Sequence, residues 1–345
     1  MKRILLTAVL TVITTCLVTS SAYSWIVVDT SGAPSIPLEG YINTVHEIDS
    51  VLNKNFRNYA GAFPLANIGG YPIGDAYIGD FPHMYFGVSA TVGCANMKYY
   101  DEDVPREKSV YPAYAPNPVL NLGFGLVKGF DLLCKVMILT DGIYRPPLNQ
   151  KSAKLSKINF YSGGAKLRKN LVGEKKVLPH LFAFGGLTVS AGADYTEGLI
   201  GINGQYDYTL NNVFLNPPGG FYNLDFYAFY NFNLHWLMLS VNAQALAYIK
   251  FLWRFDLYAG FGMALTYGYT KLEGSGIGLI SNITLGSLGS IRAVASYNKR
   301  PRAFMGLFIA GLEINIWILK LNFETMVNIS NGRDINLQLG TRFQF

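Results

Sequence analysis

Apolar and polar residues alternate with a period of two from about residue 82 to the end of the chain, the spacing of a β-strand with two different faces. The end of the chain is the clearest case. One face carries Ile335, Leu337, Leu339, Thr341, Phe343 and Phe345, and the other carries Asn336, Gln338, Gly340, Arg342 and Gln344. About thirteen such runs occur, each roughly 10–14 residues long, against about 5–6 residues for a soluble strand. They are residues 84–97, 119–127, 130–141, 158–171, 181–195, 200–210, 224–233, 237–248, 253–263, 276–290, 304–316, 319–329 and 335–345.

Runs of this length favour a membrane β-barrel over a soluble sandwich. A tilted strand needs about 9–11 residues to cross the hydrocarbon layer, and lipid tolerates no unpaired sheet edge, so such strands must close into a barrel. Bacterial barrels usually have an even number of strands, which predicts an all-β, transmembrane antiparallel β-barrel of roughly 12–14 strands over residues 82–345.

The connections between the runs alternate between short and long. Lys128-Gly129 and Asn331-Gly332 are typical of tight hairpin turns. Three segments rich in Pro, Asn or charge are expected to be long loops: residues 101–117, 142–154 and 213–222. Short turns on one side and long loops on the other are typical of outer-membrane barrels.

Residues 226–249 contain no Asp, Glu, Lys or Arg and could score as a membrane helix. Asn231, Asn233, Asn242 and Gln244, however, fall on alternating positions within dense aromatic residues. A hairpin that turns near His235 explains both features, so we favour two strands here over a helix.

The N-terminus resembles an export signal. Met1-Lys2-Arg3 is basic, residues 4–18 are apolar and without charge, and Ala22-Tyr23-Ser24 fits a cleavage site, so residues 1–24 are expected to be a signal peptide. Lipidation at Cys16 is a less favoured alternative, because Cys16 lies inside the apolar run.

Residues 25–81 are expected to form a separate N-terminal segment. Apolar residues recur every three or four positions at Leu38, Tyr41, Ile42, Val45, Ile48, Leu52, Phe56 and Tyr59, which predicts an amphipathic helix. The helix should end near Gly61 and Pro64, and the Gly-rich residues 66–80 should be turn-like. This segment could plug the barrel, cap it on the periplasmic side, or lie against the outside of its mouth.

Composition supports the barrel. Charged residues make up 14% of the chain, against about 25% in soluble domains, and half of the chain is apolar. Removing Lys2 and Arg3 leaves 26 basic and 22 acidic residues, a net charge near +4 that calls for no nucleic-acid partner. Cys94 and Cys134 lie in apolar runs, so buried, inert thiols are favoured over a disulfide.

Enzymatic chemistry has little support. The chain has no complete Gly-x-Ser-x-Gly, no phosphate-binding loop and no His-Glu-x-x-His, and its four histidines are spread out as His46, His83, His180 and His235. We therefore expect no enzyme, no metal and no cofactor.

The strand at 335–345, which ends in Phe345, resembles the terminal strand of outer-membrane barrels. This resemblance implies that Phe343 and Phe345 act as an assembly signal for the barrel assembly machinery. The hairpin of residues 121–132, the stretch from Ala310 to the end and residues 74–83 are similar to the long-chain fatty-acid transporter (FadL-type) family, including its spirochaetal members. Residues 25–81 take the place of that family's plug, although its Asn-Pro-Ala motif is absent.

The residues expected to face the lumen are mixed in character. The last two strands place Lys320, Asn322, Glu324, Asn328, Gln338 and Arg342 there, and the face that holds Glu313 also holds Met305, Leu307 and Ile309. Tyr227 and Phe229 would point inward beside Asp225. Apolar positions flanked by charges suit an amphiphile with an acidic head. Packing against a plug is the alternative, and a register shift of one residue would exchange the two faces.

The resulting hypothesis is an outer-membrane channel or transporter for hydrophobic small molecules such as long-chain fatty acids, with passive passage through a partly apolar lumen. The alternatives are a general diffusion porin and a surface adhesin or structural barrel. The expected partners are outer-membrane lipid, the barrel assembly machinery and a hydrophobic ligand. Candidate lumen ligand-binding residues are Arg254, Asp256, Met305, Leu307, Ile309, Lys320, Glu324 and Arg342.

Overall fold

Strands make up almost all of the regular structure in the computed structural model. It describes residues 25–29, 56, 59–72, 78–79, 81–100, 108–141, 149–150, 153–173, 175–178, 182–215, 220–252, 254–330, 332 and 334–345, so the expected signal peptide and most of the expected amphipathic helix lie outside the described residues. The strands are β1 (Trp25–Asp29), β2 (Met84–Tyr100), β3 (Lys108–Gly125), β4 (Phe130–Thr140), β5 (Asn149–Gln150), β6 (Ala153–Val172), β7 (Lys175–Leu178), β8 (Phe182–Leu215), β9 (Gly220–Phe251), β10 (Phe255–Asn282), β11 (Gly286–Lys299), β12 (Phe304–Ile316), β13 (Leu319–Asn328) and β14 (Ile335–Gln344). One short helix, α3 (Ala62–Ile68), precedes β2.

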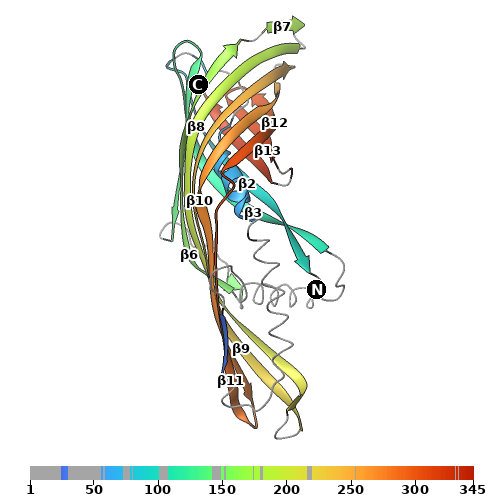
Figure 1. Ribbon diagram of the computed structural model, residues 1–345. Coiled ribbons are helices and arrows are strands. Elements are labelled where there is room, and N and C mark those ends of the chain that lie inside the picture. The colour runs from blue at the N-terminus through green and yellow to red at the C-terminus, as the bar shows by residue number, and fades with distance from the viewer. Residues whose placement is uncertain are drawn as a thin grey trace.

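The sheet closes on itself, which confirms the transmembrane antiparallel β-barrel (Figure 1). From β10 the neighbours run through β12, β13, β14, β2, β3, β4, β6, β8 and β9 and return to β10, because β9 pairs with both β8 and β10. Within the described residues the ring thus contains ten strands, although the whole sheet has 14. A ring of 12–14 strands was too many, since several runs counted as separate strands belong to one strand.

The long strands β8, β9 and β10 explain this difference. They contain 34, 32 and 28 residues, and each holds two of the runs seen in the sequence. The hairpin expected near His235 is wrong: β9 continues through His235, which lies opposite Leu199 on β8 and Lys271 on β10. With a partner strand on both sides, β9 keeps its backbone hydrogen bonds without turning.

The loop predictions are partly wrong for the same reason. Most of residues 101–117 belongs to β3, and β8 and β9 reach into residues 213–222. Among the described residues, the part of β3 before Leu120 pairs only with β2. Its prolines are tolerated there because one edge of the strand has no ladder to complete.

One end of the barrel carries tight turns, and we call it the short-turn end. Lys128 and Gly129 both have positive φ, 60° and 74°, which confirms the tight turn between β3 and β4. The turn between β12 and β13, which contains Trp317, and the C-terminus lie at the same end, at the top of Figure 1. At the opposite, distal end β8 to β11 project well beyond the other strands (Figure 1). Gly332 lies in a turn at the distal side of β13, and Asn331 is outside the described residues.

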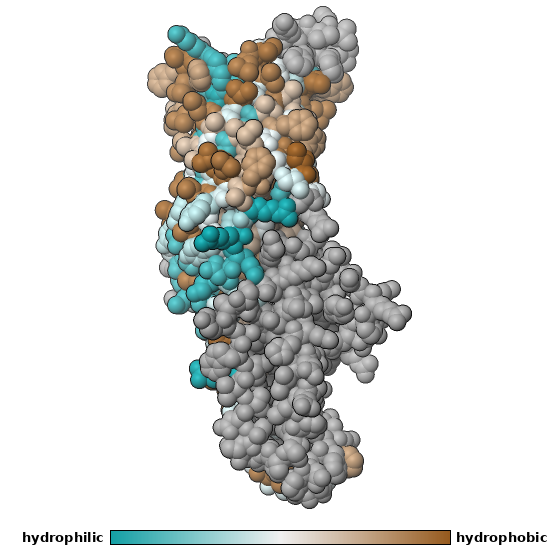
Figure 2. Space-filling view, in the orientation of Figure 1, coloured by the Kyte–Doolittle hydropathy of each residue, from teal (hydrophilic) through white to brown (hydrophobic). Residues whose placement is uncertain are grey.

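Exposed apolar side chains form a belt on the outer surface of the barrel, in the part next to the short-turn end. On β10 the outward positions are exposed and apolar from Leu257 to Tyr267, a stretch that reaches about 25 Å along the barrel axis at ordinary strand tilt. Figure 2 shows apolar residues gathered over this end and polar residues below them. Cys94 in β2 and Cys134 in β4 are free thiols, as favoured over a disulfide, although both are half-buried and not buried.

The segment before β2 lies inside the barrel. Helix α3 is fully buried and contacts β2, β3 and β14 on one side and β8 and β9 on the opposite side of the ring, so it occupies the lumen. Tyr59 and Ala60 are helical and Gly61 is a turn, so a helix ends near Gly61 as predicted. The separate helix α3 was not predicted: it begins after Gly61 and includes Pro64, which its first turn tolerates because the N–H groups there have no partner within the helix. No helix within the described ranges is long and apolar enough to span a membrane.

Candidate functional site

The candidate site is the contact between the barrel lumen and the residues that fill it. We call residues 59–72 together with Ile78 the plug. Its helix ends in the lumen, where the last carbonyls of a helix need partners from elsewhere. Ala66 O accepts hydrogen bonds from Thr91 Oγ1 and Asn117 Nδ2, both at 3.0 Å, and Leu65 O accepts one from Asn336 Nδ2 at 3.1 Å. Polar side chains from opposite ends of the sequence therefore hold one helix end.

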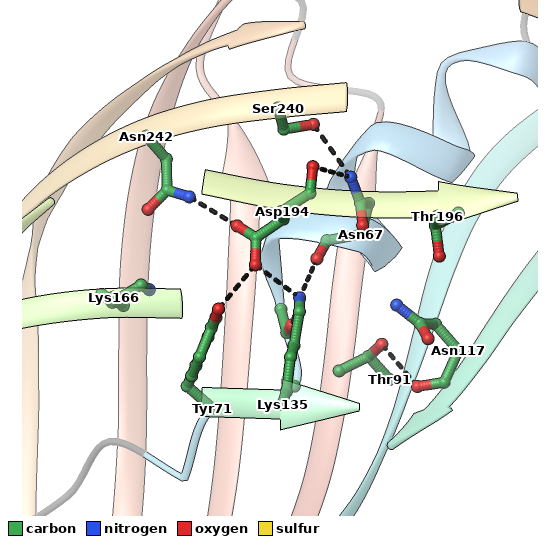
Figure 3. A network of polar contacts seen from close by, with 12 residues as sticks. Asn67, Tyr71, Thr91, Asn117, Lys135, Lys166, Asp194, Thr196, Ser240 and Asn242 are labelled. Carbon is green, nitrogen blue, oxygen red and sulfur yellow. Dashed lines mark hydrogen bonds and ion pairs between the residues drawn. The ribbon is translucent and has the colours of Figure 1, made fainter. Parts of the chain in front are cut away.

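A buried ion pair secures the next turn of the plug (Figure 3). Lys135 Nζ on β4 lies 2.9 Å from Asp194 Oδ1 on β8, and both side chains are 0% exposed. Lys135 also donates to the carbonyls of Asn67 and Gly69, the latter at 2.7 Å. The ammonium thus joins two walls of the barrel to the plug backbone between them.

Asp194 collects further donors around this pair. It accepts from Tyr71 Oη and Asn242 Nδ2, both at 2.7 Å, and its backbone carbonyl accepts from Asn67 Nδ2 at 3.1 Å. Tyr71 is buried, and its hydroxyl donates this bond directly to the carboxylate. We call Asn67, Tyr71, Lys135 and Asp194 the latch.

A second polar layer lies on the short-turn side of the latch. Gln338 accepts from Gly70 N at 2.8 Å and donates to Tyr71 O at 2.6 Å, and Arg342 Nη1 donates to Pro72 O at 3.0 Å. Arg342 also pairs with the buried Glu313 at 2.7 Å. Gln338 and Arg342 therefore hydrogen-bond to the plug backbone after the end of its helix.

The residues predicted to bind a ligand are distributed as follows. Lys320, Glu324, Arg342 and Asp256 are buried on inward positions, and Asp256 accepts from Asn315 Nδ2 at 2.7 Å. Arg254 is exposed in the turn between β9 and β10, so its placement in the lumen was wrong, because the strand begins only at Phe255.

Met305, Leu307 and Ile309 face the lumen as expected, and each is at most 1% exposed. They pack in one cluster with Leu65 and Ile68 of the plug, so in this state they fill space against the plug.

Tyr227 and Phe229, expected inside, are 42% and 51% exposed, while Ala228 between them is buried. That prediction was wrong because this part of β9 lies beyond the apolar belt, where water replaces lipid and the apolar face turns inward.

An aromatic cluster that the alternation of residues did not predict lies on the distal side of the latch. Phe63 of the plug lies 4.9 Å from Trp236 between ring centroids, and Trp236 lies 6.0 Å from Phe160. The contacts continue from Phe63 through Tyr59 to Phe56 and Tyr297. Phe56 and Tyr59 were on the predicted helix face, but their partners come from β6, β9 and β11 and share no sequence signal.

The barrel wall is incomplete next to this cluster. β3 and β4 pair only over Leu120–Gly125 on β3, next to their turn. Towards the distal end, within the described residues, β3 pairs only with β2 and β4 pairs only with β6. Met137 and Leu139, on this part of β4, pack against the cluster of Phe63 and Trp236. The aromatic cluster thus lies behind an unpaired section of the wall.

Buried charges in the described part of the chain nearly cancel. The buried cations are Lys135, Lys166, Arg168, Lys320 and Arg342, and the buried carboxylates are Asp131, Asp194, Asp256, Glu313, Glu324 and Asp334, five against six. The described residues contain no group of His, Cys, Asp and Glu side chains that could hold a metal ion. The lumen therefore offers no strong net charge to an ionic solute.

A closed antiparallel ring whose own N-terminal segment fills the lumen defines a plugged transmembrane β-barrel. Within that class, the chain belongs to the Lsa36-like family, whose model matches residues 108–345 and so leaves the plug and β2 outside the match. No curated protein matches the chain.

Solved structures with a similar course of the chain include outer-membrane barrels. The translocator domain of the autotransporter NalP from Neisseria meningitidis is 7% identical, with a TM-score of 0.29, and the match covers 76% of this chain and 88% of that one. The toluene transporter TodX from P. putida is 8% identical, with a TM-score of 0.24 and coverage of 76% and 90%. A Pseudomonas aeruginosa FadL homologue is 10% identical, with a TM-score of 0.20 and coverage of 84% and 96%. Scores this low do not identify a function.

Proposed function

We propose that this protein is an outer-membrane channel for hydrophobic small molecules such as long-chain fatty acids, held closed by its plug. The observation that carries the proposal is the aromatic cluster of Phe63, Trp236 and Phe160, which lies on the plug and behind the unpaired section between β3 and β4. The proposed partners of the protein are membrane lipid, the barrel assembly machinery and the transported molecule. It involves no catalytic step, no cofactor and no nucleic acid, and the FadL-type resemblance belongs to this proposal.

An apolar molecule gains free energy by reaching this cluster. Each methylene that leaves water contributes about 0.8 kcal/mol, and aromatic side chains offer large apolar surfaces without charge. The unpaired section of the wall gives such a molecule a way in from the side. A hydrophilic solute gains nothing from the same surface.

Onward passage requires the plug to move. On the short-turn side of the aromatic cluster, Met305, Leu307 and Ile309 belong to the same buried apolar cluster as Leu65 and Ile68 of the plug, and the polar side chains around them bond to the plug or to one another. A general diffusion porin needs a standing polar passage, and here the polar lumen side chains serve the plug. We therefore place the hydrophobic channel ahead of the porin.

A fluorescent fatty acid tests the proposal. The purified protein should bind it saturably in detergent and pass it across proteoliposomes, and Trp236→Ala should weaken both because it removes the ring between Phe63 and Phe160. Trp317→Ala is the matched control: its ring is 93% exposed at the short-turn end, and its loss should change neither. A large, steady ohmic conductance of the wild type, or equal binding by both variants, contradicts the proposal.

A surface adhesin is the second candidate, and the distal projection of β8 to β11 favours it. This part of the sheet extends well past the apolar belt and offers a broad face to other molecules. Binding to host matrix that is lost on shortening β8 and β9 symmetrically, with fatty-acid binding unchanged, would support it.

A further inference from the structure

The short strand β1 lies far from the strand that follows it along the chain. Trp25–Asp29 pairs antiparallel with β11, from Trp25 opposite Val294 to Asp29 opposite Ser290. That part of β11 pairs in turn with β10 between Ser275 and Leu279. In Figure 1, β1 is the blue strand beside β11 in the distal projection.

The paired part of β11 lies outside the apolar belt. The belt on β10 ends with Tyr267, and polar contacts follow it: Tyr269 Oη lies 3.3 Å from His235 Nδ1, and His235 lies 3.5 Å from Glu197. Ser275 is six residues beyond Tyr269, which is about 20 Å along an antiparallel strand. β1 therefore lies on the aqueous side of the distal membrane boundary.

The next strand begins at the opposite end of the barrel. Met84, the first residue of β2, exchanges backbone hydrogen bonds with Phe345, Met84 N to Phe345 O at 3.1 Å and Phe345 N to Met84 O at 2.9 Å. Between β1 and β2 the plug lies in the barrel lumen, held by the latch. The chain therefore reaches the short-turn end through the barrel.

We propose that the N-terminal segment is threaded through the barrel, with Trp25–Asp29 displayed on the distal, outer side of the membrane as an added strand of the projecting sheet. The pairing covers an edge of β11 that would otherwise be open to other chains. It also restricts the plug: while β1 is paired, the plug cannot be withdrawn at the short-turn end. The inference rests on the transmembrane fold and not on the transported molecule.

Cysteine labelling tests this topology in intact cells that carry the protein in their outer membrane. In a Cys94→Ser, Cys134→Ser background, a membrane-impermeant maleimide is applied to three single variants. Ile283→Cys reports the distal side, because Ile283 is 97% exposed in the turn between β10 and β11. Trp317→Cys, in the turn between β12 and β13, reports the short-turn side, and Asp29→Cys reports β1.

We expect Asp29→Cys to be labelled in intact cells together with Ile283→Cys, while Trp317→Cys is labelled only after permeabilisation. If Asp29→Cys is labelled under the same conditions as Trp317→Cys and not as Ile283→Cys, the proposal is overturned. This holds whichever end of the barrel faces the outside of the cell. If Asp29→Cys is labelled in neither condition, a missing disulfide between Val27→Cys and Arg292→Cys overturns the proposal, and its formation supports it.

A cross-link tests the pairing itself. Val27 lies opposite Arg292, so Val27→Cys with Arg292→Cys should form a disulfide on mild oxidation. Val27→Cys with Ser296→Cys is the matched control, because Ser296 lies four residues further along β11, about 14 Å away and outside disulfide range. Equal cross-linking of both pairs, or of neither, overturns the proposal. Fatty-acid binding by the unmodified protein remains a separate measurement, so either idea can fail alone.

Discussion

Replacing Asp194 with asparagine perturbs the latch with almost no change in volume. Three donors converge on the Asp194 carboxylate: the Tyr71 hydroxyl, the Lys135 ammonium and the Asn242 amide, at 2.7, 2.9 and 2.7 Å. Asparagine offers one acceptor oxygen, which can serve Tyr71 and Lys135, and the Asn242 amide can turn to accept a hydrogen bond from the new amide. What the substitution removes is the negative charge beside Lys135.

The size of the effect follows from burial. Both side chains of the pair are 0% exposed, and removing one partner of a buried ion pair costs about 3–5 kcal/mol. Lys135 keeps the carbonyls of Asn67 and Gly69, so we take the lower end of this range. A loss of about 3 kcal/mol changes the ratio of displaced to seated plug about a hundredfold.

Conductance in planar bilayers measures this ratio. The wild type should be closed most of the time, and Asp194→Asn should open about a hundredfold more often. Glu197→Gln removes the same charge from the outer face, where its carboxylate is 38% exposed, and should behave as the wild type. A double variant, Lys135→Met with Asp194→Asn, removes both charges of the pair and should recover part of the closure. Unchanged closure in Asp194→Asn, or equal opening in Glu197→Gln, would refute the latch.

Three further substitutions test the plug, a turn and barrel closure. Gly93→Ala should unseat the plug and increase conductance, because a Cβ there would lie 2.1 Å from Ala62 O; at Gly163 the nearest atom is 3.9 Å away, so Gly163→Ala should stay closed. Gly129→Val should lower the refolded yield in detergent, because φ is +74° there, while Gly173→Val, with no atom within 4 Å, should refold normally. Phe345→Ala should reduce the heat-modifiable, folded fraction in membranes, because it removes a ring 6.1 Å from Phe86 where the last strand meets the first strand of the ring.

The strand faces inside the membrane were predictable from the sequence. On β13 and β14 the inward residues Asn322, Glu324, Gln338 and Arg342 are buried, and apolar residues such as Leu337 are exposed on the outer face, as the alternation predicted. The bilayer imposes opposite polarity on the two faces of each strand, so a local pattern is enough. At Tyr227 and Phe229 the same rule failed because there is no lipid outside that part of β9.

The latch and the aromatic cluster were not predictable residue by residue. Asp194 and Lys135 sit in ordinary strand patterns, and nothing local marks them as partners across the lumen. Trp236 was placed next to an expected turn, whereas β9 runs on and directs its ring at Phe63. Lys135 and Asp194 are 59 residues apart in the chain and Phe63 and Trp236 are 173 apart, and the positions of these side chains depend on where each strand starts around the ring.

Local periodicity by itself determined that this chain forms amphipathic strands, which side of each membrane strand faces lipid, and that an N-terminal segment precedes the barrel. The tertiary structure alone decided how many strands close the ring, that the plug lies inside it, and that β1 pairs with β11 at the distal end. The physical reason is that alternation is enforced by each strand's own surroundings, whereas closure and plug seating depend on hydrogen bonds and ion pairs between distant segments, which a local pattern does not record.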